Sequence, residues 1–327
     1  MPHAICMHEH GGPEVLRWEE IDARPLERGE IRVRHEAVGL NYIDVYHRTG
    51  LYPVPALPCV PGLEGAGEVI ELGPEVNGLE IGDRVAYASP PLGAYAEERT
   101  LPADRVVRLP EEIPAETAAA LMLQGMTAEY LIRRTYPCRE GETVLLHAAA
   151  GGVGLIASQW LHALGVEVIG TVGSPAKAEL ARAHGCTHTI LYREEDVVAK
   201  VRDLTGGRGV PVVYDSVGRA TWEASLDCLR PRGVMVSFGN ASGPVEPVNL
   251  GELSQKGSLF VTRPTLMHYT AERSELEASA GALFDVVRSG KVHAHIGQRF
   301  PLREAAAAHR ALEARETVGS TVLTVDR

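Results

Sequence analysis

The sequence predicts an α/β fold, with a doubly wound parallel sheet in the middle of the chain and a smaller β-rich domain formed by both ends. Short β-patterned runs between Gly and Pro clusters fill the first 124 residues. Strand and helix patterns then alternate to about residue 262, as in βαβ units. The last residues return to a strand pattern that needs a sheet to join. A length of 327 residues also favours two domains, which we place at 1–124 with 263–327 and at 125–262.

The first part of the chain has the pattern of a β-rich domain. We expect strands at 31–38, 65–72, 84–88 and 105–109, separated by clusters such as YPVPALPCVPG and ELGPEVNG. A helical stretch follows at 115–123. Tyr46 and Tyr52 are expected in a polar loop bounded by prolines.

The middle of the chain alternates between the two periodicities. Expected helices lie at 127–134, 152–165, 175–184, 194–204 and 221–229. Expected strands lie at 143–148, 166–172, 187–191, 210–215 and 233–238. Strands separated by helices of this length predict right-handed crossovers and a parallel sheet.

The tail has a long helix at 270–289, and then a strand, a proline and another helix within KVHAHIGQRFPLREAAAAHRALE. A final strand is expected at 319–326. A lone terminal strand must pair with an existing sheet, and the N-terminal β domain is its natural host.

Composition excludes several classes of protein. The net charge of -11, with no long basic run, argues against nucleic acid as a main partner. Five cysteines lie far apart and form no CxxC pair, which indicates reduced thiols in a cytoplasmic protein. The N-terminus lacks a signal-peptide pattern, and no apolar run reaches the roughly 18 residues of a membrane helix.

Residues 143–154, TVLLHAAAGGVG, form the central motif. They read as a strand, a turn of small residues and the start of a helix. Ala149, Gly151 and Gly154 fall at the three spacings of the dinucleotide fingerprint, with Ala in place of the first Gly. Gly152 and Val153 complete the turn. Bare N–H groups at a helix N-terminus suit a pyrophosphate.

The next strand predicts which dinucleotide binds. NAD-specific domains carry an acidic residue about 20 positions after the fingerprint, but Gly173 and Ser174 stand there. Lys177 follows three residues later, and Tyr192 comes just after the third strand. A hydroxyl and an ammonium would bind a 2′-phosphate that a carboxylate would repel. We therefore expect NADPH.

The whole chain resembles the zeta-crystallin-like quinone oxidoreductases of the medium-chain dehydrogenase/reductase superfamily. The resemblance rests on HGGPEVL, GLNYIDVYHRTGLYP, PGLEGAGEV, HAAAGGVGLIA, VVYDSVG, MVSFGNASGPV and QKGSLFVTRPTL, in the family's order. It implies a GroES-like catalytic domain around a Rossmann-like NADPH-binding domain. It also implies a homodimer joined through the nucleotide-binding domains, with a quinone as substrate.

The resemblance also implies site residues. Those around the nicotinamide ribose and phosphates would be Asn41, Tyr46 and Thr127, and Tyr52 would line the pocket with the segment around Arg263. Asn41, Tyr46 and Tyr52 are the catalytic candidates. The remaining cofactor contacts would be Ser216, Phe238, Gly239, Asn240, Val261, Thr262 and Arg263. Asp44 and Glu64 are the nearest carboxylates, and we expect Glu64 to be structural.

No metal is expected. Zinc alcohol dehydrogenases of the superfamily have a catalytic Cys, a Gly-His-Glu motif and a lobe of four cysteines. Here Asn41-Tyr42-Ile43-Asp44 and Gly62-Leu63-Glu64 stand at the first two places, and the cysteines are not clustered. Zinc needs several N or S ligands, which these positions do not supply.

Two alternatives to an NADPH:quinone reductase stay open. An enoyl or alkenal reductase of the same fold must protonate a carbon after hydride addition, which would need a donor such as Tyr46 or Tyr52. A non-catalytic NADPH-binding or RNA-associated protein is the other alternative, although the acidic charge disfavours RNA.

Overall fold

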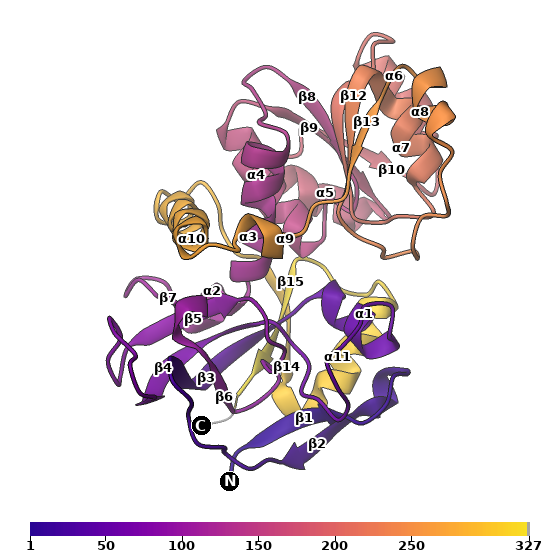
Figure 1. The fold of residues 1–327 in the computed structure, drawn as a ribbon. Helices are drawn as coiled ribbons and strands as arrows, with labels where there is room; N and C mark the ends of the chain where they lie inside the picture. Colours follow the sequence, from indigo (N-terminus) through magenta and orange to yellow (C-terminus); the bar gives the residue numbers. More distant parts are fainter. Residues whose placement is uncertain (326–327) are drawn as a thin grey trace. The chain divides into compact units, whose positions relative to one another are not determined.

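The computed structural model describes residues 1–325 and divides the chain into two compact units (Figure 1). Unit 1 contains residues 1–124, 270–284 and the described chain from 294 onward. Unit 2 contains residues 125–269 and 285–293. The expected domain bounds differ from these units over 263–269 and 285–293, so the expected bounds stay a prediction.

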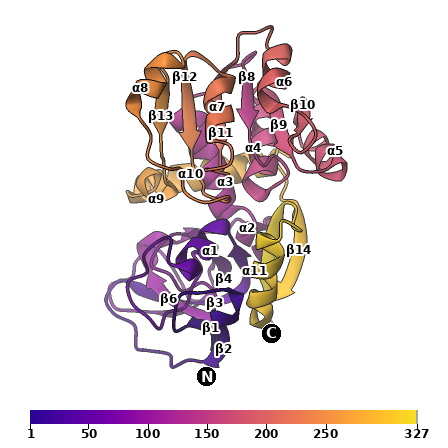
Figure 2. The same ribbon diagram turned by 90° about the vertical axis from the view of Figure 1, so that its right-hand side faces the viewer.

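Unit 2 is built on a six-stranded parallel sheet, which confirms the expected doubly wound architecture (Figure 2). Its strand order is β10-β9-β8-β11-β12-β13. The bounds are β8 Thr143–Leu146, β9 Glu167–Val172, β10 His188–Leu191, β11 Val210–Asp215, β12 Leu229–Ser237 and β13 Phe260–Thr262. The order reverses between β8 and β11, and such a reversal marks the ligand crevice of a doubly wound sheet.

Helices alternate with these strands. They are α4 Gly152–Ala163, α5 Pro175–Ala183, α6 Val197–Leu204, α7 Trp222–Cys228 and α8 Leu250–Gln255. Helix α4 contacts α5, and α6 contacts α7, so each pair shares a face of the sheet. All six residues of β11 are buried, as expected for a central parallel strand covered on both faces. Helices α3 Met122–Tyr130 and α9 Leu266–Tyr269 and a π-helical turn at Leu131–Thr135 complete this part of the chain.

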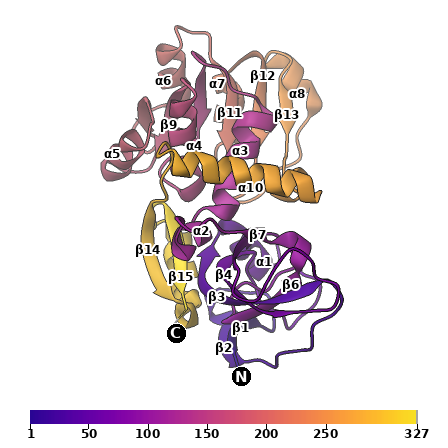
Figure 3. The same ribbon diagram turned by 90° about the vertical axis from the view of Figure 1, so that its left-hand side faces the viewer.

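Unit 1 contains a seven-stranded sheet in the order β14-β15-β3-β4-β5-β7, with β6 also paired to β3 (Figure 3). The bounds are β3 Glu30–Leu40, β4 Glu64–Leu72, β5 Arg84–Ala88, β6 Glu98–Pro102, β7 Val107–Arg108, β14 Ile296–Pro301 and β15 Ser320–Thr324. Strand β15 pairs antiparallel with β3, which confirms that the terminal strand joins the N-terminal sheet. Residue 326 of the expected strand lies outside the described residues.

The other elements of unit 1 surround this sheet. Strands β1 His3–Met7 and β2 Leu16–Glu20 form a separate antiparallel pair. The helices are α1 Tyr42–Thr49, α2 Ala115–Ala119 and α11 Ala305–Glu313, and α10 Arg273–Arg288 contributes its first part. The core of the unit gathers Ile31, Val33, Val69, Val85 and Leu101 from four strands, all fully buried.

Several sequence expectations were wrong in detail. The expected polar loop around Tyr46 is helix α1, and Tyr46 is buried on it. The expected strand at 105–109 shortens to β7, because a 3₁₀ turn occupies Ala103–Arg105. Strand β8 ends before Ala148, whose φ of 53° is incompatible with a strand. Within residues 1–325, no helix combines the length and apolar character needed to cross a membrane.

Candidate functional site

The fingerprint turn joins β8 to α4 at the carboxyl edge of the parallel sheet. Its backbone is held from two sides: the Ala149 N–H donates to the Thr171 carbonyl at 3.1 Å, and the Gly151 N–H donates to the Ala148 carbonyl at 2.9 Å. Gly151 is the N-cap of α4, and no side chain caps the helix there. The first N–H groups of α4 are therefore available to an anion.

The small residues of this turn are required by close backbone contacts. A Cβ on Gly154 would lie 2.4 Å from the Ala148 carbonyl oxygen and 2.7 Å from that of Ala149. A Cβ on Gly170 of β9 would lie 2.6 Å from the Ala149 methyl group. Ala149 can therefore replace the first glycine of the fingerprint because Gly170 leaves room for its methyl.

A second group of residues gathers where β9 and β10 end. Ser174 is the N-cap of α5, and its hydroxyl accepts from the Lys177 N–H at 3.4 Å. The Tyr192 N–H donates to the Val172 carbonyl at 3.2 Å. A Cβ on Gly173 would lie 2.9 Å from the Tyr192 hydroxyl. The structure thus brings Gly173, Ser174 and Tyr192 together, with Lys177 in the first turn of α5.

The ends of β11, β12 and β13 form a third group on the same edge of the sheet. Arg263 donates to the Gly239 carbonyl at 2.9 Å and to the Ser237 hydroxyl at 3.2 Å. It also donates to the Asn240 amide oxygen at 3.0 Å when that amide is oriented to suit its neighbours. A Cβ on Gly239 would lie 2.3 Å from the Ser216 carbonyl oxygen, which brings Ser216 into this group.

The remaining predicted residues of unit 2 are more scattered. Phe238 follows β12, and its N–H donates to the Asp215 carbonyl at 2.8 Å. Val261 and Thr262 lie on the edge strand β13, where the Val261 side chain is partly exposed. Thr127 is buried on α3.

Buried polar side chains next to the fingerprint turn form a hydrogen-bond network. His147 contacts the Thr171 hydroxyl through Nδ1 at 2.9 Å and the Ser225 hydroxyl through Nε2 at 3.0 Å. Ser225 donates to the Asp215 carboxylate at 2.7 Å. Because Ser225 has only one hydrogen, His147 must donate from Nε2 and accept at Nδ1. Burial lowers the pKa of His147, which favours this neutral form.

In unit 1, Asn41 is the N-cap of α1, and Tyr46 and Tyr52 follow on and after that helix. The Tyr46 and Tyr52 rings lie 5.0 Å apart, and the Tyr52 N–H donates to the Tyr46 carbonyl at 3.0 Å. Asn41 is buried, and its amide donates to the Glu64 carboxylate at 2.6 Å. The three catalytic candidates are therefore neighbours on one helix and its C-terminal turn.

Two fully buried carboxyl groups lie beside Asn41. Burial raises the pKa of Glu64 to about 8, against opposing hydrogen bonds from Asn41 and Leu123. Burial raises the pKa of Asp44 to about 7, although the Asn41 N–H and the Tyr95 hydroxyl donate to this carboxyl. Perturbed carboxyl groups of this kind are typical of functional sites. Sequence reasoning treated Glu64 as structural. Strand β4 also contains Glu68 and Glu71, so the sequence does not mark Glu64 as the one that is fully buried.

The donor set does not suit zinc. All five cysteines are unpaired thiols, and Cys6, Cys186 and Cys228 are buried. Across residues 1–325, no group of three or more His, Cys, Asp or Glu side chains is arranged to hold a metal ion. The place of a zinc-ligating histidine is taken by Leu63, which has no donor atom.

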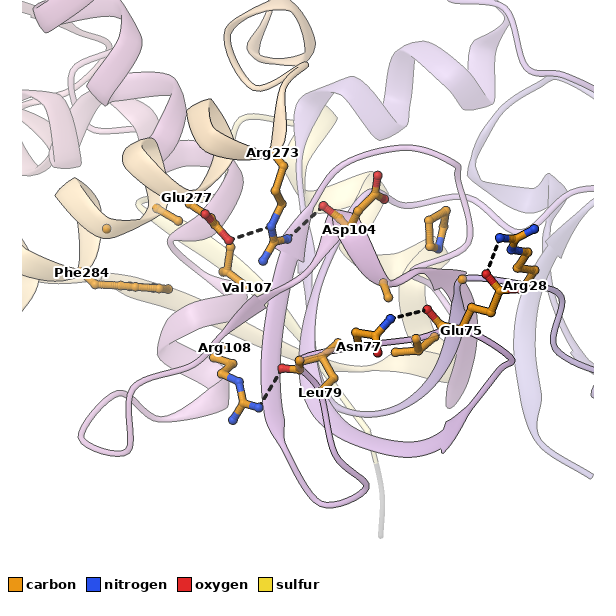
Figure 4. A pocket seen from close by; sticks show the side chains of 17 residues that line it. Arg28, Glu75, Asn77, Leu79, Asp104, Val107, Arg108, Arg273, Glu277 and Phe284 are labelled. Carbon is orange, nitrogen blue, oxygen red and sulfur yellow. Dashed lines mark hydrogen bonds and ion pairs between the residues drawn. The ribbon is translucent and has the colours of Figure 1, made fainter.

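A cavity of about 930 Å³ within unit 1 is lined by other residues (Figure 4). Arg28 pairs with Glu75, and Arg273 pairs with Glu277 at 2.8 Å on its walls. Arg108 donates to the Gly78 carbonyl at 2.8 Å. None of the predicted site residues lines this cavity, and its labelled arginines all have protein partners (Figure 4).

Comparison with protein families gives two matches. Residues 27–111 match the alcohol dehydrogenase GroES-like domain, and residues 152–278 match the zinc-binding dehydrogenase family.

Individual relatives match over the whole chain. The chain is 58% identical to a quinone oxidoreductase of Pseudomonas aeruginosa, covering 99% of each chain. It is similar to the crystal structure of an Escherichia coli quinone oxidoreductase complexed with NADPH, with a TM-score of 0.97 and 50% identity, covering 98% of this chain and 99% of that one. It is also 46% identical to a 2-haloacrylate reductase of a Burkholderia species, covering 99% of each chain.

Proposed function

Because the chain belongs to the quinone oxidoreductase family of the medium-chain dehydrogenase/reductase superfamily, we propose that this oxidoreductase reduces quinones with NADPH. The observation that carries the choice of cofactor is the group of Gly173, Ser174, Lys177 and Tyr192 at the ends of β9 and β10. It offers hydroxyl groups and an ammonium where an NAD-specific domain would have a carboxylate. The E. coli relative, crystallised with NADPH, supports the same choice.

The residues of the sheet edge bind and orient the cofactor, which supplies the hydride when bound. The turn from Ala149 to Gly154 would hold the pyrophosphate through the first N–H groups of α4, those of Gly152, Val153 and Gly154. Ser174 and Lys177 would hold the 2′-phosphate. We propose Thr127, Ser216, Phe238, Gly239, Asn240, Val261, Thr262 and Arg263 as the remaining contacts of unit 2. In unit 1 we propose Asn41 and Tyr46 as cofactor contacts and Tyr52 as a residue of the quinone pocket. No step requires a metal ligand.

Replacing Lys177 tests the cofactor proposal. We expect Lys177→Ala to raise the KM for NADPH roughly tenfold or more, since a charge-assisted hydrogen bond contributes about 1.5–3 kcal/mol. The KM for NADH should stay within about twofold of the wild-type value, because NADH has no 2′-phosphate for Lys177 to bind. Steady-state oxidation of each cofactor with a benzoquinone measures both values.

Lys200→Ala on α6 is a matched control, since Lys200 pairs with Glu195 at 3.6 Å and belongs to no predicted site. It should leave both KM values unchanged. An equal rise for NADPH and NADH in Lys177→Ala would contradict a role in reading the 2′-phosphate.

A second candidate activity is the reduction of an activated double bond. The 2-haloacrylate reductase relative supports it. Turnover of a 2-haloacrylate or an enal in parallel with a quinone, each with NADPH, separates the two activities.

We also propose a cytoplasmic homodimer joined through unit 2. Strand β13 is the edge of the parallel sheet, and Phe260 on it is 61% exposed beside Val261 at 39%. An apolar edge strand of this kind is suited to pairing with a second copy. Phe260→Lys should convert the protein to a monomer in sedimentation experiments; an unchanged mass would contradict this interface.

A further inference from the structure

Four side chains of unit 1 form a continuous hydrogen-bond chain that starts at Glu64. The Asn41 Nδ2 donates to Glu64 Oε2 at 2.6 Å, and the Gln124 Nε2 donates to Asn41 Oδ1 at 3.1 Å. The Ser320 hydroxyl follows, 2.7 Å from Gln124 Oε1 and 2.9 Å from the Ala120 carbonyl oxygen. All four side chains are buried, so each must find its hydrogen-bond partners among these four side chains or the groups directly beside them.

The far end of this chain is unsatisfied in that orientation. Ser320 has one hydroxyl hydrogen, but Gln124 Oε1 and the Ala120 carbonyl oxygen are both acceptors. One of the two contacts is therefore an approach of two acceptors without a hydrogen between them. The chain makes three hydrogen bonds when read in this direction.

Reversing both amides removes the conflict. An amide can exchange its N and O positions without moving any other atom. Gln124 then donates to Ser320, Ser320 donates to Ala120, and Asn41 donates to Gln124. The Asn41 oxygen now faces Glu64 Oε2, which must carry a proton to donate to it. The reversed chain makes four hydrogen bonds among these groups, whereas the observed orientation also lets the Asn41 side chain accept from the Asp44 N–H in the capping box of α1.

The surroundings of Glu64 accommodate both protonation states. Its Oε1 accepts from the Leu123 N–H at 2.7 Å, and the Met122 N–H at the start of α3 also donates to this carboxyl group, which favours the carboxylate. Burial and the neighbouring Asp44 oppose the charge and raise the pKa of Glu64 to about 8. The other titratable groups that face it are Tyr87 and Tyr95. A Cβ on Gly39 would lie 2.3 Å from Glu64 Oε2, so the fold keeps this space for the carboxyl group.

We propose that Glu64, Asn41, Gln124 and Ser320 form a hydrogen-bond chain with two polarities, and that the proton on Glu64 selects between them. Reversal exchanges the positions of the amide nitrogen and the amide oxygen of Asn41. It therefore changes which of the two Asn41 can offer to a ligand. Glu64 and Gln124 are positioning residues for Asn41, and this part rests on the proposed role of Asn41 as a cofactor contact. We take the protonated polarity, in which the Ser320 conflict is absent, as the one that orients Asn41 for the cofactor.

Two titrations of the full-length protein test the chain. The first is the infrared band of protonated carboxyl groups in the protein without cofactor, which should lose intensity as Glu64 ionises near pH 8. The second is the Kd for NADPH between about pH 7 and 9.5, measured by fluorescence without quinone, which should rise roughly three- to tenfold as that band fades.

Variants distinguish coupling along the hydrogen-bond chain from a direct electrostatic effect of the Glu64 charge. Glu64→Gln places an N–H donor against Asn41. It should abolish the infrared step near pH 8 and the NADPH step, while the infrared step of Asp44 near pH 7 stays. Ser320→Ala is neutral and does not contact Glu64, yet it removes two hydrogen bonds from the protonated chain and one from the ionised chain. It should therefore move both steps to lower pH. Ser89→Ala, a buried serine outside the chain, should leave both unchanged.

Each outcome is decisive. An infrared step that Ser320→Ala does not move would overturn the coupling along the chain. An infrared step without a change in NADPH affinity would overturn the link from Asn41 to the cofactor. Neither measurement uses quinone, so a protein that fails to reduce quinones while showing both coupled steps would refute the proposed reaction and support the chain.

Discussion

The sheet edge of unit 2 and the buried chain of unit 1 hold polar groups in opposite ways. At the sheet edge, backbone N–H groups and the solvent-accessible side chains of Ser174, Lys177 and Tyr192 stand at the ends of strands. In unit 1, Asn41, Glu64 and Gln124 are buried, and their neighbour Asp44 is a second buried carboxyl group. The first arrangement suits binding of a charged ligand by preformed donors. The second suits orienting one amide, at the cost of burying titratable groups.

This difference determines which kind of substitution each region is sensitive to. The sheet edge is sensitive to added side-chain volume. Its donors are backbone N–H groups, and a ligand can approach them closely only where the residues of the turn are small. The buried chain depends on protonation, because every atom in it already has a neighbour. Steric substitutions should therefore damage the first region, and charge-neutralising ones should alter the second.

The largest effect is expected from Gly154→Ala. The new methyl would meet backbone carbonyl oxygens at 2.4 and 2.7 Å, which cannot move without distorting the turn. We expect a loss of stability of up to about 3 kcal/mol and a roughly hundredfold weaker affinity for NADPH. Calorimetry and fluorescence titration measure the two quantities.

Gly281→Ala on α10 is the matched control, since no atom lies within 4 Å of its new methyl. It should stabilise the protein by about 0.5–1 kcal/mol and leave NADPH binding unchanged. Unaltered NADPH binding in Gly154→Ala would show that the turn tolerates the methyl and that space is not its limiting property.

The second effect concerns the dependence of stability on pH, and it tests the buried chain. Glu64 has its pKa raised to about 8 in the folded protein from an ordinary value of 4.5. The unfolded chain therefore loses this proton first, and wild-type stability falls as pH rises from about 4.5 to 8. Glu64→Gln lacks this loss and should be more stable than wild type above neutral pH, by an amount on the order of a few kcal/mol.

Urea unfolding at several pH values measures this difference, which should vanish below about pH 4.5. Asp44→Asn is the comparison variant, because Asp44 has its pKa raised to only about 7. Its advantage should be smaller and should level off at lower pH. A stability difference between Glu64→Gln and wild type that does not change with pH would contradict the buried titration.

The two regions also differ in how far the sequence predicts them. The fingerprint turn, the alternation of strands and helices, and the group at Gly173 and Ser174 are local patterns, set by neighbours within one βα unit. The chain around Glu64 joins residues 23, 83 and 196 positions apart, so no local pattern marks it. Only folding brings these side chains together.

Helix α1 was missed for a related reason. Its buried residues include Asp44, His47 and Arg48, so burial does not follow the apolar periodicity that sequence reasoning uses. Arg48 is held by Glu313 at 2.7 Å, 265 positions away. Strand β13 was missed because it has three residues, and Phe260 and Val261 on it are exposed in this chain.

The smallest effect is expected from Tyr52→Phe, which lies outside both sensitive regions. Tyr52 is only half-buried, and its ring packs against Tyr46 at 5.0 Å, a contact that phenylalanine preserves. A quinone accepts protons from solvent, so quinone reduction should change by less than about twofold. Reduction of an enal or a 2-haloacrylate requires protonation of a carbon, and it would fall by about 10²-fold or more if Tyr52 were its donor. Initial rates of NADPH oxidation with both acceptors, compared with Tyr46→Phe, identify the tyrosine involved.

If quinone turnover in Tyr52→Phe also collapsed, Tyr52 would act on a binding or orientation step common to both acceptors. The idea that quinone reduction needs no protein donor at this position would then be wrong.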